Sequence, residues 1–264
     1  MCPRPDDQTL IVFPLPGNMD LDSMALFEDV SARLAALHQR IDAACARAGR
    51  PAGAVTLLAV GKGQNLAALR AAADAGARDF AESYVQEALP KVAALRDRGL
   101  RWHFIGPVQG NKTADVAAHF DWVHGVDRER IARRLAEQRP AGLPPLNVCV
   151  QVNISGEASK SGVAPDEVLA LCRVVAALPR LKLRGLMAIP APVARPKKGD
   201  SPLFHEDGKG DSPPYRRLRE LFESLRREFE LDTLSAGMSD DFEAAIAEGS
   251  TMVRIGTALF GPRM

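Results

Sequence analysis

The feature that most constrains the fold is a regular alternation of strand-like and helix-like segments along most of the chain. Short apolar runs predict buried strands, and longer runs with apolar residues three and four positions apart predict helices. Eight predicted strands cover 55–62, 79–83, 102–105, 122–126, 147–153, 183–189, 233–236 and 252–259. Seven predicted helices separate them, at 66–75, 85–96, 112–119, 128–138, 165–178, 215–229 and 241–248.

An amphipathic helix ahead of the first strand completes the pattern. Its apolar residues recur at three- and four-residue steps: Leu26, Val30, Leu34, Leu37, Ile41 and Cys45. This helix can take the place of the one missing after the eighth strand. Eight strands and eight helices in this order predict a closed (β/α)8 barrel. A doubly wound open sheet is the alternative, which the regular alternation and the length of 264 residues make the weaker interpretation.

Two segments lie outside the alternation. Residues 1–22 contain the short apolar run Leu10–Phe13, but two aspartates precede it and Pro14 and Pro16 interrupt it, so it makes a poor signal peptide. We predict a disordered extension there and a barrel domain over 23–264. Residues 191–214 contain prolines, glycines and Lys197-Lys198 with almost no apolar side chains, which predicts a mobile loop.

Composition excludes several classes of protein. The net charge of +1 argues against a general nucleic-acid binder. No apolar run approaches membrane-spanning length. The five histidines show neither HExxH nor a Cys/His cluster, so we expect no metal site. The four cysteines are scattered, which is typical of reduced thiols in a cytoplasmic protein. Without an exposed apolar stripe or a second domain, we expect a monomer.

Lys62 stands at the end of the first predicted strand, between Gly61 and Gly63. In barrels of this type the carboxyl ends of the strands form the mouth that carries the chemistry. A desolvated lysine there can lose its proton and form a Schiff base with a carbonyl compound. An ordinary lysine with its ammonium in water is the alternative, and on this residue alone it would be preferred.

Small and polar residues follow the seventh and eighth predicted strands: Ser235, Gly237, Ser239, Gly256 and Thr257. Phosphate sites of such barrels often lie in these two loops. Arg254 and Gly256 share one face of the last strand by its two-residue period. Turn chemistry alone would explain these residues, but together with Lys62 they fit an aldehyde that carries a phosphate. A nucleotide is less favoured, because P-loop spacing fails around Lys62.

Eight short runs are more specific than this general pattern. They are Leu58–Lys62, Glu82–Glu87, Trp102–Gly106, Gln109–Lys112, Gln151–Asn153, Gly185–Met187, Gly237–Asp241 and Arg254–Thr257. Together they strongly resemble the pyridoxal phosphate homeostasis proteins, single-domain relatives of the alanine racemase barrel. The resemblance extends over roughly residues 26–261. It departs from the family at several positions, among them Gly61 and Gly63, where the family usually has Ser and Thr.

The resemblance implies a (β/α)8 barrel of the alanine racemase N-terminal type that holds pyridoxal 5′-phosphate (PLP) as a Schiff base on Lys62. It further implies that Ser235, Gly256 and Thr257 hold the phosphate and that Arg254 faces the pyridine nitrogen. Four more residues would line or support the pocket: Asn153, Met238, Ser83 and His103.

An arginine opposite the pyridine nitrogen bears on whether such a protein is an enzyme. PLP enzymes that stabilise carbanions place a carboxylate there to keep the ring nitrogen protonated. The chain ends at Met264 directly after strand eight, and neither of its tyrosines, Tyr84 and Tyr215, is an obvious second base. We therefore expect no robust catalysis but a carrier that buffers PLP or delivers it to PLP-dependent apo-enzymes. A weak amino-acid racemase is the alternative, followed by a phosphosugar aldolase or isomerase that uses Lys62 without a cofactor.

Overall fold

The structure of this chain is a computed structural model that describes residues 21–157, 161–190 and 212–262. Eight strands form one closed barrel in which each strand pairs in parallel with the next and the last pairs with the first. The strands are β1 Thr56–Val60, β2 Asp79–Glu82, β3 Arg101–Phe104, β4 Trp122–Val126, β5 Leu146–Gln151, β6 Leu181–Met187, β7 Thr233–Met238 and β8 Met252–Ile255. The predicted (β/α)8 barrel is confirmed.

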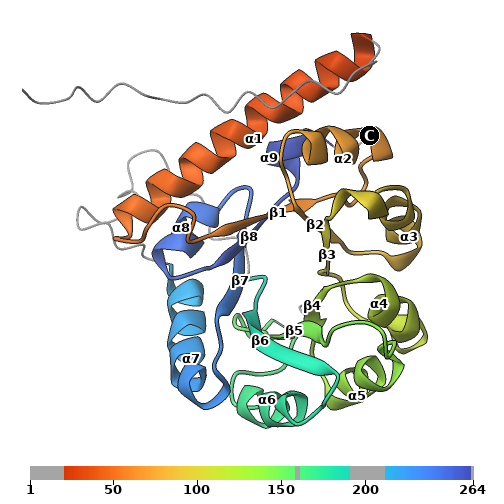
Figure 1. Cartoon of the computed structure of the whole chain (residues 1–264). Coiled ribbons are helices and arrows are strands. Elements are labelled where there is room, and N and C mark those ends of the chain that lie inside the picture. The colour runs from red at the N-terminus through yellow and green to blue at the C-terminus, as the bar shows by residue number, and fades with distance from the viewer. Residues whose placement is uncertain (1–20, 158–160, 191–211, 263–264) are drawn as a thin grey trace, which may run out of the picture.

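Helices surround this barrel on the outside (Figure 1). They are α1 Leu21–Arg47, α2 Leu66–Asp74, α3 Val85–Ala94, α4 Thr113–His119, α5 Glu129–Gln138, α6 Val168–Ala176, α7 Pro213–Phe229, α8 Phe242–Ala247 and α9 Thr257–Phe260. Two single turns of 3-10 helix add η1 Arg96–Arg98 and η2 Gly110–Lys112. Helices such as α6, α7 and α8 bury apolar side chains against the strands, and this burial drives the layered arrangement.

Helix α1 closes the ring as the sequence predicts. It packs against α2, α8 and α9, and it runs across the first and last elements of the barrel (Figure 1). Val30, Leu34 and Leu37 on its predicted apolar face are buried. Next to this face Arg40 donates to Glu243 Oε1 of α8 and lies 4.6 Å from the Phe242 ring centre.

The end of the barrel differs from the prediction. We expected a last strand over 252–259, but β8 ends at Ile255 and Thr257–Phe260 forms the short helix α9. The Gly256 carbonyl accepts hydrogen bonds from the amides of Leu259 and Phe260, and both side chains are buried. A short apolar run fits a strand and a buried helix equally well, and the contact with α1 selects the helix.

The predicted extension at 1–22 lies outside the described residues except for its last two positions, which begin α1. The predicted loop at 191–214 likewise lies outside them over 191–211, while α7 begins at Pro213. Proline suits a first helical turn, where its missing N–H costs nothing. Among the described residues, no helix is long and apolar enough to cross a membrane.

The interior of the barrel is only partly apolar. Six buried residues form a cluster that is separate from the main core: Leu58, Ala81, Trp122, Cys149, Met187 and Met252. His103, His124, Ser235 and Arg254 are buried alongside them on the strands of the same barrel. By the two-residue period, the next inward positions toward the carboxyl ends are Val60 and Ile105, so these ends line the barrel mouth.

Candidate functional site

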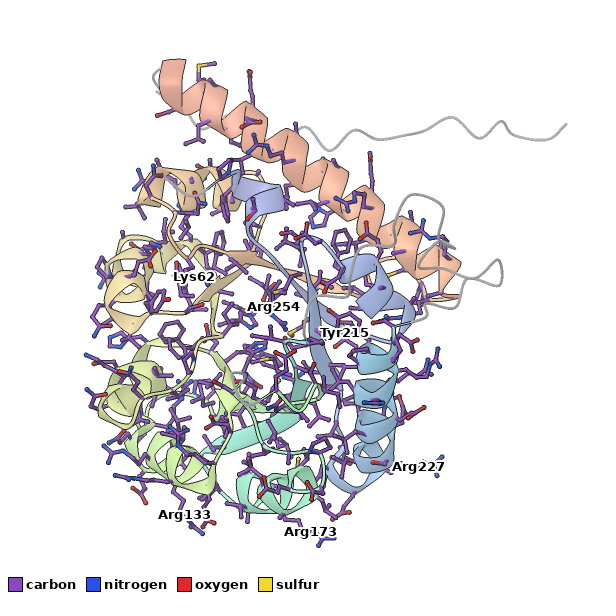
Figure 2. The ribbon with its side chains drawn as sticks, turned by 180° about the vertical axis from the view of Figure 1, so that it is seen from behind. Lys62, Arg133, Arg173, Tyr215, Arg227 and Arg254 are labelled. Carbon is purple, nitrogen blue, oxygen red and sulfur yellow. The ribbon has the colours of Figure 1, made fainter. Side chains whose placement is uncertain are left out.

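A cavity of about 260 Å³ opens at the carboxyl ends of the strands. Figure 2 shows two of its cationic side chains, Lys62 and Arg254, inside the ring of helices. Its walls are Val60, Lys62, Gln64, Ser83, Ile105, Ile189, Met238, Ser239, Asp240, Arg254, Gly256 and Thr257. The residues come from the ends of several strands, which is where barrels of this type assemble a site from elements far apart in the sequence.

The loop that carries Lys62 is held on both sides of the lysine. The Gly61 carbonyl accepts a hydrogen bond from Lys91 Nζ at 2.8 Å, and the Gly63 amide donates to Glu87 Oε1 at 2.7 Å. Gly63 has a φ of +70°, a conformation that glycine adopts without a steric penalty. These bonds fix the backbone of a three-residue turn, so Lys62 projects into the cavity from a defined position.

Behind this loop lies a buried ion cluster. Lys91 Nζ is 2.9 Å from Glu82 Oε1 and 2.6 Å from Glu87 Oε1, so with Gly61 the three donors of the ammonium are all used. The second oxygen of Glu82 is buried without a hydrogen-bond partner among the described residues. Burial raises the pKa of the Glu82 carboxyl to about 7, although the hydrogen bond from Lys91 opposes this. Lys91 is therefore committed to the fold, whereas Lys62 lines the cavity.

The neighbouring wall, at the end of β8, offers backbone amides to an anion. The N–H groups of Gly256 and Thr257 donate to no other described residue, as is usual for the first turn of a helix. A Cβ atom built on Gly256 would meet nothing closer than Val60 at 3.6 Å, so this glycine keeps space open within the cavity. Ser239 adds a hydroxyl on the same wall. This combination fits a phosphate group.

Arg254 is held rigidly, with only 4% of its surface exposed. Its Nη1 donates to the Ser235 carbonyl at 2.8 Å and to Ser235 Oγ at 2.9 Å, and Nη2 donates to the Ala188 carbonyl at 2.9 Å. Burial lowers the pKa of the guanidinium, while Tyr215 and Asp241 oppose that shift. A guanidinium stays charged even so, and it can donate but cannot accept a hydrogen bond.

The structure brings most of the predicted site residues together. Six of them line the cavity: Lys62, Arg254, Gly256, Thr257, Met238 and Ser83. Ser235 and His103 are fully buried in the barrel interior behind the cavity, and neither is one of its walls. Asn153 follows β5 and donates to the Glu157 carbonyl at 2.8 Å, and it is not a wall of the cavity either.

Several residues that line the cavity were not predicted from the sequence. Val60, Ile105 and Ile189 follow inward-facing residues by two positions at the ends of β1, β3 and β6, so the strand period could have identified them. Gln64, in contrast, is a buried polar residue of a loop, and no sequence pattern pointed to it.

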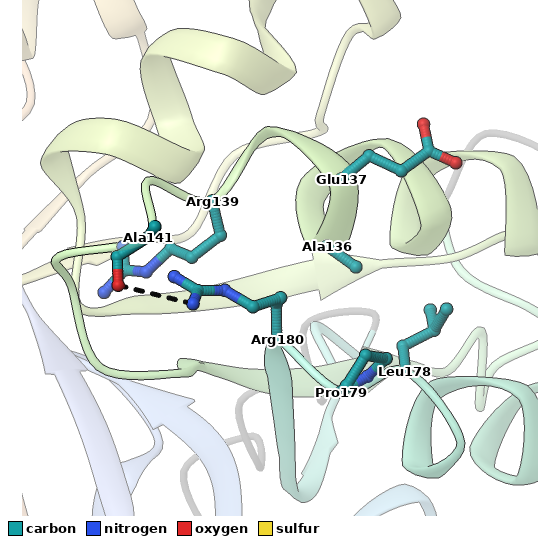
Figure 3. Close-up of a pocket in the computed structure, with 7 residues that line it drawn as sticks. All are labelled: Ala136, Glu137, Arg139, Ala141, Leu178, Pro179 and Arg180. Carbon is teal, nitrogen blue, oxygen red and sulfur yellow. Dashed lines mark hydrogen bonds between the residues drawn. The ribbon is translucent and has the colours of Figure 1, made fainter.

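A second hollow of about 360 Å³ lies near the amino ends of β5 and β6, lined in part by Arg139 and Arg180 (Figure 3). Arg139 donates to the carbonyls of Ala117, Phe120 and Pro144. Arg180 donates to the carbonyls of Pro140, Ala141 and Leu143. These guanidinium groups tie down the connection before β5, which is a structural role. Over the described residues, no cluster of three metal-binding side chains occurs.

Comparison with known proteins agrees with this geometry. Residues 32–264 match the family described as alanine racemase, N-terminal domain. A pyridoxal phosphate homeostasis protein of Pseudomonas aeruginosa is 56% identical over 234 residues, which cover 89% of this chain and 96% of the relative. PipY of Synechococcus elongatus, solved with PLP bound, has a TM-score of 0.71 and 32% identity, covering 88% of this chain and all of PipY.

Alanine racemase of Corynebacterium glutamicum shares the fold with a TM-score of 0.61 and 17% identity, and the match covers 90% of this chain and 61% of the racemase. The barrel, the family match and the extent of the identity with the Pseudomonas protein lead to one assignment. This chain belongs to the alanine racemase N-terminal domain family, among the pyridoxal phosphate homeostasis proteins.

Proposed function

We propose that this protein binds PLP in the Lys62 cavity and acts in PLP homeostasis, holding or delivering the cofactor. The observation that carries the proposal is the convergence of Lys62, Arg254 and the open backbone at Gly256 on one cavity. The names of the relatives and the PLP-bound structure of PipY support it. The cavity volume of about 260 Å³ is close to the lower end of the range for small-molecule sites.

Each polar group of the cavity has a role in this proposal. The amides of Gly256 and Thr257, with the Ser239 hydroxyl, hold the phosphate. When bound, PLP supplies an aldehyde that condenses with an amine, and Lys62 provides that amine with loss of one water. Arg254 would donate to the pyridine nitrogen of the cofactor, and since a guanidinium cannot accept a proton there, the nitrogen would stay unprotonated and the ring would be a weaker electron sink.

The tyrosines support a carrier over a robust catalyst. The Tyr215 phenol is buried and donates to Asp241 Oδ2 at 2.7 Å, and burial raises its pKa. Tyr84 is 58% exposed and lines a different, smaller hollow. Neither tyrosine is a wall of the Lys62 cavity. A racemase needs a second acid–base group opposite its lysine, and these phenols do not supply one.

The first test is trapping of the cofactor. Purified protein incubated with PLP should absorb in the visible range, bleach with borohydride and carry a pyridoxyl group on the peptide that contains Lys62. Lys62→Ala should lose that adduct while it keeps its unfolding midpoint, because the side chain is only half-buried. Lys112→Ala is the matched control, since Lys112 lies beside a neighbouring hollow of the same mouth. A wild-type protein that stays colourless and unmodified would overturn the proposal.

A second measurement separates carrier from enzyme. The loaded protein is incubated in deuterated water with single amino acids, and exchange at the α-carbon is followed by NMR. We expect rates no higher than those of free PLP. Exchange well above that level, abolished in Lys62→Ala and retained in Lys112→Ala, would establish racemase-like catalysis instead.

Delivery to apo-enzymes and a monomeric state are parts of the same proposal. Over the part of the chain that the structure describes, the exposed large apolar residues are Met24, Tyr84 and Leu143, which lie far apart in the sequence and do not predict a dimer interface. Sedimentation should therefore give the mass of one chain. A PLP-dependent apo-enzyme should be reactivated faster by the loaded protein than by PLP released from it, and equal rates would argue against direct transfer.

A further inference from the structure

A continuous line of hydrogen bonds crosses the barrel interior and ends at the cavity. His103 Nε2 is 3.1 Å from Asp79 Oδ1, and His103 Nδ1 is 3.0 Å from His124 Nε2. His124 Nδ1 is 2.9 Å from Ser235 Oγ, which is 2.9 Å from Arg254 Nη1. These five residues come from β2, β3, β4, β7 and β8. None of their side chains is exposed, since the largest exposed fraction is the 6% of Asp79.

The partners define which atom carries each proton. The ionised Asp79 carboxylate can only accept, so His103 donates from Nε2 and a neutral His103 accepts at Nδ1. His124 must then donate from Nε2, and its Nδ1 accepts a hydrogen bond from the Ser235 hydroxyl. From the other end, Arg254 can only donate and so occupies an acceptor site of Ser235 Oγ. The Asp79 end sets these tautomers, and the bond from Arg254 is compatible with them because Ser235 Oγ can accept from Arg254 while it donates to His124.

Burial keeps the two imidazoles neutral. Burial lowers the pKa of His103, with Asp79 and Asp121 opposing the shift and Arg101 adding to it. Burial also lowers the pKa of His124, and His103 and Arg254 lower it further. Burial by itself would raise the pKa of Asp79, but hydrogen bonds from Arg101 and His103 hold it at about 2. The line therefore has a negative end, a positive end and no charge between them.

We propose that Asp79, His103 and His124 are positioning residues of the Lys62 cavity, which hold the Arg254 guanidinium in one orientation through a single set of tautomers. Three of the five N–H donors of Arg254 go to Ser235 and Ala188, which leaves two for a ligand of the cavity. Fixing the guanidinium plane fixes where those two donors point. The effect of this orientation on PLP binding rests on the proposed function, whereas the assignment of the tautomers is independent of it.

The tautomers are tested on the wild-type protein labelled with ¹⁵N-histidine, with and without PLP. Long-range ¹H–¹⁵N spectra should show His103 and His124 protonated on Nε2 alone, with shifts that stay constant between about pH 5.5 and 8, where an ordinary histidine titrates. His103→Gln and His124→Gln assign the two signals, and His119→Gln is the control because His119 is an exposed histidine outside the line. A ring that titrates in this range, or that carries its proton on Nδ1, would overturn the proposal.

The positioning role is tested with Asp79→Asn, which removes the distant charge but keeps the shape, and with Ser235→Ala, which deletes one oxygen in case the first variant does not fold. Each should weaken PLP binding about two- to tenfold, the worth of one hydrogen bond, and shift the pH titration of the bound chromophore. His119→Gln should match wild type. Folded variants with wild-type affinity and titration would refute the positioning role and leave the proposed function intact. A wild-type protein that binds no PLP would refute the proposed function, and the histidine spectra would still decide the tautomers.

Discussion

Two of the hollows of the barrel that have cationic side chains differ in the backbone groups beside those cations. The hollow near the amino ends of β5 and β6 is the larger, at about 360 Å³ against about 260 Å³ for the Lys62 cavity. Its two arginines donate to six main-chain carbonyls between them. At the Lys62 cavity Arg254 also makes three hydrogen bonds, but there the amides of Gly256 and Thr257 lie beside it and donate to no described residue.

The difference teaches that volume alone does not identify a binding site. An arginine that donates to main-chain carbonyls stabilises the fold, and a ligand that took its place would have to break those existing bonds. A cavity with unused donors offers interaction energy at no such cost. Within the Lys62 site, the three donors of Lys91 go to Glu82, Glu87 and the Gly61 carbonyl, so Lys91 belongs to the fold behind the cavity.

The largest expected effect is a loss of stability when an arginine of the hollow near the amino ends of β5 and β6 is replaced. Arg139→Met should lower the free energy of unfolding by about 3–5 kcal/mol, because three carbonyls lose a charged donor in a buried place. Arg180→Met should cost only about 1 kcal/mol, since Arg180 is partly exposed and water can replace it. Urea unfolding measures both, and PLP binding at saturation should be retained in each. Equal losses of unfolding free energy in the two variants would contradict the conclusion that buried Arg139 stabilises this connection more than Arg180 does.

The next effect is a pH dependence of the free energy of unfolding, and it comes from Glu82 behind the Lys62 cavity. Since the folded pKa of Glu82 is about 7 against an ordinary 4.5, the folded state keeps a proton that the unfolded state releases in this window. Stability should therefore fall as pH rises from 4.5 to about 7, by on the order of 2–3 kcal/mol from this group, and then level off.

Glu82→Gln removes this titration while its amide oxygen can still accept from Lys91, so its profile of unfolding free energy should be flatter across that window. Glu137→Gln is the control, because Glu137 is an exposed carboxylate at the rim of the other hollow. Unfolding in urea at a series of pH values gives the slopes. Parallel profiles for wild type and Glu82→Gln would show that Glu82 does not hold the proton.

The smallest effect compares two glycines near the cavity. Gly237 has a φ of +93°, and its Cβ would lie 2.7 Å from Ala245 Cβ, so Gly237→Ala should cost about 2 kcal/mol of stability. Gly256→Ala should leave stability nearly unchanged, because the new methyl group meets only Val60 at 3.6 Å. It should instead weaken PLP binding about tenfold, since the methyl group takes space from the phosphate. Undiminished affinity in Gly256→Ala would place the phosphate elsewhere.

Sequence patterns predicted the barrel closely. Strand β4 has the predicted bounds, and all eight predicted strands and all eight predicted helices are present, because buried strands and amphipathic helices carry strong local signals. The prediction was wrong at the end of the last strand, over 256–259, where contact with α1 makes a helix of a strand-like run. Lys62, Arg254 and Gly256 were predicted from residue type and position at strand ends, and they line one cavity.

By itself, then, the sequence determined the architecture and the identity of the cavity's main polar groups, because both follow from local periodicity, strand order and specific motifs. Only the tertiary structure decided which cations are consumed by the fold and which polar groups connect behind the cavity. His124 and Ser235 are 111 positions apart, and Lys91 reaches Gly61 across 30. Such contacts depend on the closure of the barrel and on rotamers chosen by packing, and no local pattern records them.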